Sequence, residues 1–371
     1  MKNINAYIAG ILMCVFGLIP PIKFVVQQPS EYFQWWLAIA GFLGVYTLFI
    51  KTDLIVQVIA VGGLIHSFYS KVPYLSQEAY VSIVACCYFY ILCRTIQDHA
   101  IVVKFLISLM LLHGVFFFMQ FIGHDTYFNF SRQVCFGVVG QHMQSASFSV
   151  ILAAVLFGVS PFVLAFPLFA SWFCHSAGAF LCVILSGLPY LPTFGNRKFA
   201  IKFFIFLFAW FMAWLILSHK MMENLSMHSG RLAAWVNTLR IWSVHPFTGW
   251  GFGTYKGVFY ALSGMTARPY VTAHNAPIQI LFEGGLIWFV IIYGYVGYLF
   301  VNIISLLRRK IMEPQARACL AGMTMMAVNM MFHFPDRQIQ CVLLIVYFLA
   351  FIKGVVENGS RQTCHSKQSV S

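Results

Sequence analysis

The residues best suited to chemistry lie in one long polar segment, from His219 to Ala273, and directly after it. The segment holds five cations against a single acid, Glu223. The cations are Lys220, Arg231, Arg240, Lys256 and Arg268. A glycine-rich turn, Gly249-Trp250-Gly251-Phe252-Gly253, follows within it, and the segment ends in His274-Asn275. Cationic side chains bind phosphate, and an imidazole can accept a proton near neutral pH. We therefore expect this segment to handle a phosphate-bearing, lipid-carried substrate.

The two arginines nearest the glycine turn belong to one predicted helix, residues 229–242, which Ser229 would cap. With about 100° of rotation per residue, Arg240 lies about 180° from Arg231, so a straight helix cannot aim both into one pocket. The residues on the same face as Arg231 are Trp235, Thr238 and Trp242. At the helix N-terminus, Arg231 suits an anionic ligand. The alternative is an interfacial helix whose arginines contact lipid phosphate.

The rest of the chain predicts an all-α, polytopic integral membrane protein that forms one domain over residues 1–371. Of its residues 60% are hydrophobic and only 9% are charged, which no water-soluble fold of this length could bury. A span needs about 20 mostly apolar residues. We expect about twelve spans, near residues 5–22, 33–50, 54–70, 78–95, 100–122, 142–158, 160–174, 176–192, 200–218, 283–306, 316–333 and 338–356.

The charges predict which way these spans run. With both termini in the cytoplasm, the short inner loops carry the Lys and Arg residues, as the positive-inside rule requires. These residues are Lys51, Arg94, Arg197, Lys198, Lys202, Arg308, Arg309, Lys310, Arg317, Arg361 and Lys367. Residues 219–282 then form a long periplasmic loop with short helices, and the polar tail at 357–371 is expected to be disordered. Neither the cysteines nor the histidines have the spacing of a metal site.

Several motifs together resemble the O-antigen ligase/polymerase family, bacterial membrane enzymes that transfer glycans from an undecaprenyl-diphosphate carrier. In the loop these are Arg231, the run His-Pro-x-x-Gly-x-Gly at 245–251, His274-Asn275 and Glu283-x-Gly285. Upstream, Arg132-x7-Gly140-Gln141 is similar to an arginine–glycine stretch of the family. Ser176-x-Gly178-Ala179 is similar to its Ser-Arg-x-Ala motif, although Ala177 replaces the arginine. The resemblance covers about residues 132–305.

This resemblance implies a metal-independent glycosyl transfer without a cofactor, on the periplasmic side of the bacterial inner membrane. His274 matches the essential histidine and would be the base. Arg231 is the first candidate for binding the diphosphate, and Arg132 and Arg240 are the second. The supporting positions that shape the loop are Gly249, Gly251, Asn275, Glu283 and Gly285.

The acceptor stays open among three classes: lipid A-core, a growing polysaccharide chain, or a protein hydroxyl. We favour an O-antigen ligase over a polymerase or a protein O-oligosaccharyltransferase. A secondary transporter is the alternative from another class, since twelve spans suit it, but the span midplanes are almost free of the charge that transporters place there. A non-catalytic partner of an envelope assembly is a third reading. No feature suggests nucleic acid; we expect the basic residues to meet anionic lipid.

Overall fold

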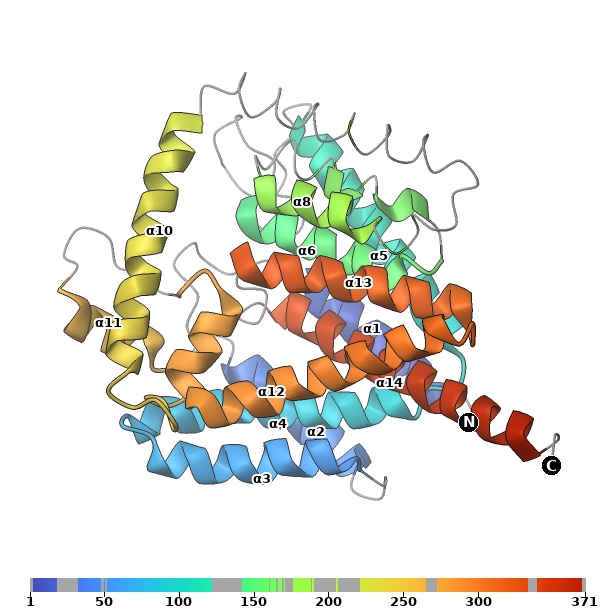
Figure 1. Cartoon of the computed structure of the whole chain (residues 1–371), viewed down its shortest axis with the longest axis horizontal. Helices are drawn as coiled ribbons and strands as arrows, with labels where there is room; N and C mark the ends of the chain where they lie inside the picture. The colour runs from blue at the N-terminus through green and yellow to red at the C-terminus, as the bar shows by residue number, and fades with distance from the viewer. Residues whose placement is uncertain are drawn as a thin grey trace.

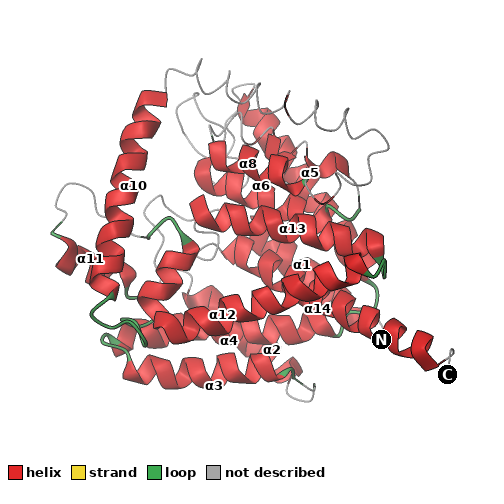
Figure 2. Ribbon diagram, viewed as in Figure 1, coloured by secondary structure: helices red, strands yellow, loops and turns green. Residues whose placement is uncertain are grey.

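The computed structural model describes most of the chain as helices (Figures 1 and 2). The described residues are 3–18, 33–47, 50, 52–121, 142–159, 161–164, 166–168, 170, 176–187, 189, 205, 221–264, 272–332 and 339–368. No strand occurs among them, so the all-α prediction is confirmed. The elements are α1 (Ile4–Leu18), α2 (Phe33–Thr47), α3 (Leu54–Tyr69), α4 (Pro73–Arg94), α5 (His99–Phe121), α6 (His142–Leu156), η3 (Pro161–Leu164), α8 (Ala177–Ser186), α10 (Met221–Trp242), α11 (Tyr255–Ser263), α12 (Ala276–Arg308), α13 (Glu313–Phe332) and α14 (Ile339–Gln368).

Four of the helices in these ranges are long and apolar enough to cross a membrane, namely α4, α5, α12 and α14. Shorter apolar helices occupy the predicted spans at α1, α2, α3 and α6. The predicted span at 200–218 lies outside the described residues except for Ile205. The apolar pattern therefore located most of the helices, while the number of crossings and their direction remain predictions.

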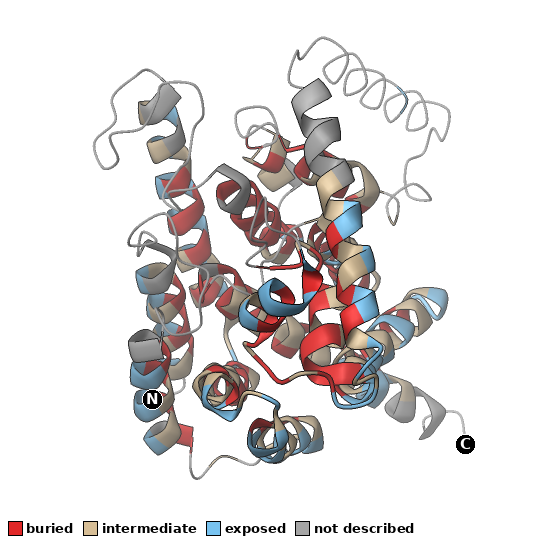
Figure 3. Ribbon diagram, turned by 90° about the vertical axis from the view of Figure 1, so that its left-hand side faces the viewer, coloured by how far each residue is buried: buried red, intermediate tan, exposed pale blue. Residues whose placement is uncertain are grey.

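The helices pack around α4, α6, α13 and α14. Helix α4 lies against α2, α3 and α14, and α6 lies against both α13 and α14. Large side chains such as Phe89, Phe148 and Leu152 are fully buried where these helices meet. Inward faces are buried and outward faces exposed, as Figure 3 shows. Exposed apolar residues such as Val45 and Leu111 are those that lipid would cover in a membrane.

One end of the bundle is joined by ion pairs. Arg94, the last residue of α4, lies 3.5 Å from the carboxyl group of Asp53, which precedes α3, and also pairs with Glu357 of α14. Lys353 lies 3.5 Å from Glu357 on the same helix. The tail that we expected to be disordered from residue 357 instead continues α14 to Gln368. The pairing of Glu357 supplies a physical reason, since it ties the start of that tail to α4.

Candidate active site

Helix α12 is broken near its start, at Gly285. This residue has φ 68° and ψ −172°, which is not helical, so a short segment from Ala276 to Gly284 meets a long one at an angle (Figure 1). In an unbroken helix, the N–H groups of Leu286 and Ile287 would bond to the carbonyls of Phe282 and Glu283. The break separates these four groups, and each needs a new partner because an unpaired buried backbone group costs about 1–3 kcal/mol.

The turn that follows α10 supplies all four partners. Leu286 and Ile287 donate to the carbonyls of Pro246 and Phe247, at 2.8 and 3.2 Å. Trp250 donates to the carbonyl of Phe282 at 3.0 Å, and Gly251 donates to that of Glu283 at 2.8 Å. Residues 245–253, which we call the splice loop, therefore stand in for the missing turn of α12. The His-Pro-x-x-Gly-x-Gly run and the Glu-x-Gly run form one structural unit.

The glycines of this unit lie where no side chain fits. A Cβ on Gly249, at φ +67°, would be 2.5 Å from the carbonyl oxygen of Glu283. A Cβ on Gly285 would meet the carbonyl of Phe247, and one on Gly251 would meet the hydroxyl of Ser70. All three have positive φ, which glycine adopts without strain. Left-handed geometry therefore favours glycine at all three positions, and close backbone contact requires it at Gly249 and Gly285.

Glu283 fixes the splice loop through its side chain as well. Glu283 is only 2% exposed, and its carboxyl group accepts hydrogen bonds from the N–H groups of Gly253, at 3.0 Å, and Tyr255, at 3.4 Å. The amide of Gln279 donates to the same group at 3.1 Å. Gln279 was not among the predicted site residues. Its spacing of four residues from Glu283 on a helix was the signal that could have found it.

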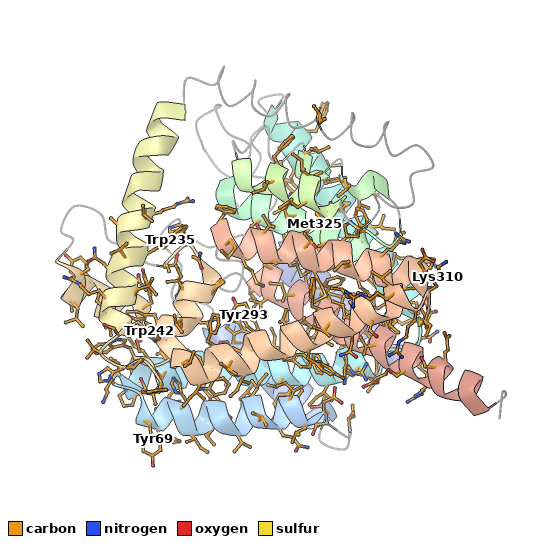
Figure 4. The ribbon with its side chains drawn as sticks, viewed as in Figure 1. Tyr69, Trp235, Trp242, Tyr293, Lys310 and Met325 are labelled. Atoms are coloured by element: carbon orange, nitrogen blue, oxygen red, sulfur yellow. The ribbon has the colours of Figure 1, made fainter. Side chains whose placement is uncertain are left out.

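His274 lies directly before α12, and hydrogen bonds hold the chain at both of its neighbours, Ala273 and Asn275. The N–H of Ala273 donates to Gln279 at 3.1 Å, and its carbonyl accepts the indole N–H of Trp235 at 2.7 Å. Trp235 projects from α10 toward the first segment of α12 (Figure 4). Asn275 caps α12 by accepting from Ile278 at 3.0 Å. These contacts hold His274 at φ 51°, a left-handed conformation that is rare outside glycine and frequent at functional sites.

Arg231 acts on His274 electrostatically. Burial, and secondarily the positive charge of Arg231, lower the pKa of His274 to about 3, so the imidazole is neutral at pH 7. Arg231 lies one turn before Trp235 on the side of α10 that carries the buried Ala234 and Thr238. Arg240 is exposed, on the opposite side. The structure thus brings Arg231, but not Arg240, together with His274.

Helix α10 begins earlier than we predicted. It starts at Met221, so Ser229 lies inside the helix and is not its cap. The preceding Met, Glu and Leu residues favour a helix, which explains the earlier start. Arg231 therefore lies in the third turn, away from the free N–H groups of the helix end. The prediction that Arg231 lies at the helix N-terminus, where free N–H groups would favour an anion, is therefore wrong.

The remaining predicted residues are only partly placed. Arg132 lies outside the described residues, so its relation to His274 is untested. Ser176 caps α8 by accepting from the N–H of Ala179 at 3.2 Å. Within the described part of the chain, no three His, Cys, Asp or Glu side chains gather that could hold a metal ion.

A family model matches the part of the chain that holds this site. Residues 135–293 match the O-antigen ligase family, a range that includes α10, the splice loop, His274 and Gly285. A search of curated proteins found no match for the chain. The matched range covers most of the segment in which the sequence motifs resembled this family. Over residues 135–293, a range that holds the candidate site, the chain is thus similar to the O-antigen ligase family.

Proposed function

We propose that the chain transfers a glycan from an undecaprenyl-diphosphate carrier to an acceptor hydroxyl, on the periplasmic face of the bacterial inner membrane. The observation that carries the proposal is that Arg231 acts electrostatically on His274 inside the matched range, while Trp235, Gln279 and Asn275 hold the backbone on both sides of His274. A cation and a neutral imidazole at one site are the two groups that displacement of a diphosphate by a hydroxyl requires.

Arg231 would stabilise the leaving group. Breaking the bond between the anomeric carbon and the diphosphate oxygen places negative charge on the undecaprenyl diphosphate. A guanidinium donates two parallel hydrogen bonds to phosphate oxygens and keeps its charge at every physiological pH. The half-buried position of Arg231 strengthens this attraction relative to bulk water.

His274 would accept the acceptor's proton. The acceptor oxygen forms the new bond to the anomeric carbon while its proton moves to the imidazole, and the diphosphate leaves with the electrons of the broken bond. A pKa of about 3 makes His274 a weak base in the free protein. A bound diphosphate offsets the charge of Arg231, which raises the pKa of His274 toward the range in which a base works best. Donor binding would then prepare the base before the acceptor reacts.

Among acceptors we propose lipid A-core, and hence an O-antigen ligase. The matched family is described as O-antigen ligase. A polysaccharide polymerase or a protein O-oligosaccharyltransferase would use the same two residues with another acceptor. Mass spectrometry of the products formed by purified protein, with one lipid-linked donor and each acceptor class in turn, separates the three.

Replacement of the two residues tests the proposal, and Arg240 provides the matched control. His274→Ala should lower the rate of glycan transfer about 10²–10⁴-fold, the usual contribution of a general base. Arg231→Ala should also abolish most transfer, whereas Arg240→Ala, on the same helix but its exposed side, should retain it. The measurement is transfer in reconstituted vesicles at equal protein abundance. Full activity of both His274→Ala and Arg231→Ala would overturn the proposal.

A further inference from the structure

The splice loop is also held by a segment far away in sequence, the turn between α3 and α4. This turn lies about sixty residues before the matched range 135–293. The backbone N–H of Lys71 donates to the carbonyl of Trp250 at 3.1 Å, and the Ser70 hydroxyl donates to the same carbonyl at 3.1 Å. The Ser76 hydroxyl lies 2.9 Å from the carbonyl of Phe252. The N-terminal helices therefore contact the candidate active site directly.

His66, in the last turn of α3, reaches the centre of the same unit. Its Nε2 lies 3.3 Å from the carbonyl oxygen of Glu283, so the Nε2–H tautomer donates to it. The imidazole ring packs against Phe252, with 4.6 Å between ring centroids, and against Trp288, with 6.0 Å. The Glu283 carbonyl thus accepts from both His66 and Gly251, at the point where α12 is broken.

Two hydrogen bonds link Glu283 to the backbone next to His274. The carboxyl group of Glu283 accepts from Gln279, and Gln279 in turn accepts from the N–H of Ala273, the neighbour of His274. Each step is a hydrogen bond between groups that are largely buried. A shift of the Glu283 backbone would therefore displace both the splice loop and the base.

We infer that His66 is a positioning residue for glycan transfer: its hydrogen bond to the Glu283 carbonyl holds the break in α12, and with it His274, in the reactive geometry. This rests on the proposed function of His274. Displacement of a reacting group by about 1 Å can cost roughly 100-fold in rate, so loss of a supporting bond should lower kcat without weakening donor binding.

Two substitutions separate the hydrogen bond from the ring packing. His66→Phe keeps an aromatic ring against Phe252 and Trp288 but removes the donor. His66→Gln keeps an N–H donor near the Nε2 position but removes the ring. We expect His66→Phe to lower kcat roughly tenfold with little change in KM, and His66→Gln to recover most of that loss.

His99 offers a matched control at the start of α5. Its Nδ1 lies 3.0 Å from the Tyr347 hydroxyl, and its ring packs against Tyr347 and Phe351. His99→Phe therefore removes the same kind of bond from the same kind of aromatic surroundings, away from the splice loop. It should leave both kcat and KM unchanged.

Hydrogen exchange of the splice loop provides a readout that does not depend on activity. The amides of Trp250, Gly251 and Gly253 are bonded to Phe282 and Glu283, so His66→Phe should speed their exchange in the full-length protein, while His99→Phe should not. Unchanged exchange and unchanged kcat in His66→Phe would overturn the inference, as would a loss confined to KM or a His66→Gln variant no better than His66→Phe. If His274→Ala and Arg231→Ala both kept full transfer, the proposed function would fail instead, and the exchange arm would still show whether His66 holds the loop.

Discussion

The two ends of the helix bundle are held together by different means. At one end, Arg94 pairs with the acids Asp53 and Glu357, so charge is matched by charge between α3, α4 and α14. At the other end, the buried acid Glu283 bonds to amide N–H groups of Gly253, Tyr255 and Gln279. The first arrangement satisfies its cation within the protein. The second builds a rigid frame from backbone and amide groups and keeps a cation, Arg231, beside a neutral histidine.

The second arrangement suits a site whose geometry must be held. The buried carboxyl group of Glu283 is bonded to N–H groups of the splice loop, of Tyr255 and of Gln279, so one side chain fixes several segments at once. The ion pairs of Arg94 join helix ends whose side chains are partly exposed, where charge pairs contribute modestly to stability. The contrast between the two ends can be tested, because each depends on residues that can be replaced separately.

The largest effect is expected at the glycines of the splice loop. Gly249→Ala and Gly285→Ala would each place a Cβ against backbone atoms at a positive φ, where strain and overpacking together cost about 2–5 kcal/mol. Transfer should fall more than 100-fold, and the melting temperature in detergent should drop. Transfer assays and thermal unfolding of the purified variants measure both.

Gly257 is the control for these substitutions. It lies within α11, and a Cβ there would meet nothing within 4 Å. Gly257→Ala should therefore stabilise the protein slightly, by about 0.5–1 kcal/mol, and keep transfer intact. Wild-type activity in Gly249→Ala would contradict the tight contact between the splice loop and the break in α12.

At the end of the bundle that is held by ion pairs, we expect a smaller effect, on stability and not on transfer. Arg94→Ala leaves Asp53 and Glu357 without their shared cation, and the side chains are partly exposed, so the loss should be about 1–2 kcal/mol. The melting temperature should fall while transfer per folded molecule stays unchanged. A variant that unfolds no more easily but transfers less would show that the two ends are not independent.

Much of this architecture could be predicted from residue types, and the rest could not for a definite reason. Apolar runs located α3, α4, α5 and α12, and the helix phase correctly separated Arg231 from Arg240. The sequence singled out Gly249, Gly251 and Gly285, but the exchange of backbone bonds between their segments could not be predicted, because Pro246 and Phe247 contribute only carbonyl groups that every residue has.

Long-range partners were invisible for the same reason. Ser70 and His66 contact the splice loop and its partner Glu283 across about two hundred residues of chain, and no local sequence pattern predicts such a contact. The start of α10 was misjudged because Ser229 has the residue type of a cap, whereas the helix-favouring residues before it continue the helix.

The last effect concerns acid, and it depends on the end of the bundle that carries His274. The pKa of His274 is lowered to about 3 by burial and by Arg231, so between pH 6.5 and 3 the unfolded chain binds a proton that the folded protein does not. Stability therefore falls as the pH drops below 6.5, by up to about 1.4 kcal/mol per pH unit for this group.

His274→Gln cannot titrate, so its melting temperature should fall less than that of the wild type between pH 7 and pH 5. Arg94→Ala leaves His274 in place, and its melting temperature should fall over that range as steeply as the wild type's. Equal slopes for His274→Gln and the wild type would mean that the imidazole is not held neutral by its surroundings, and the frame around it would then be looser than the contacts of Ala273 and Asn275 indicate.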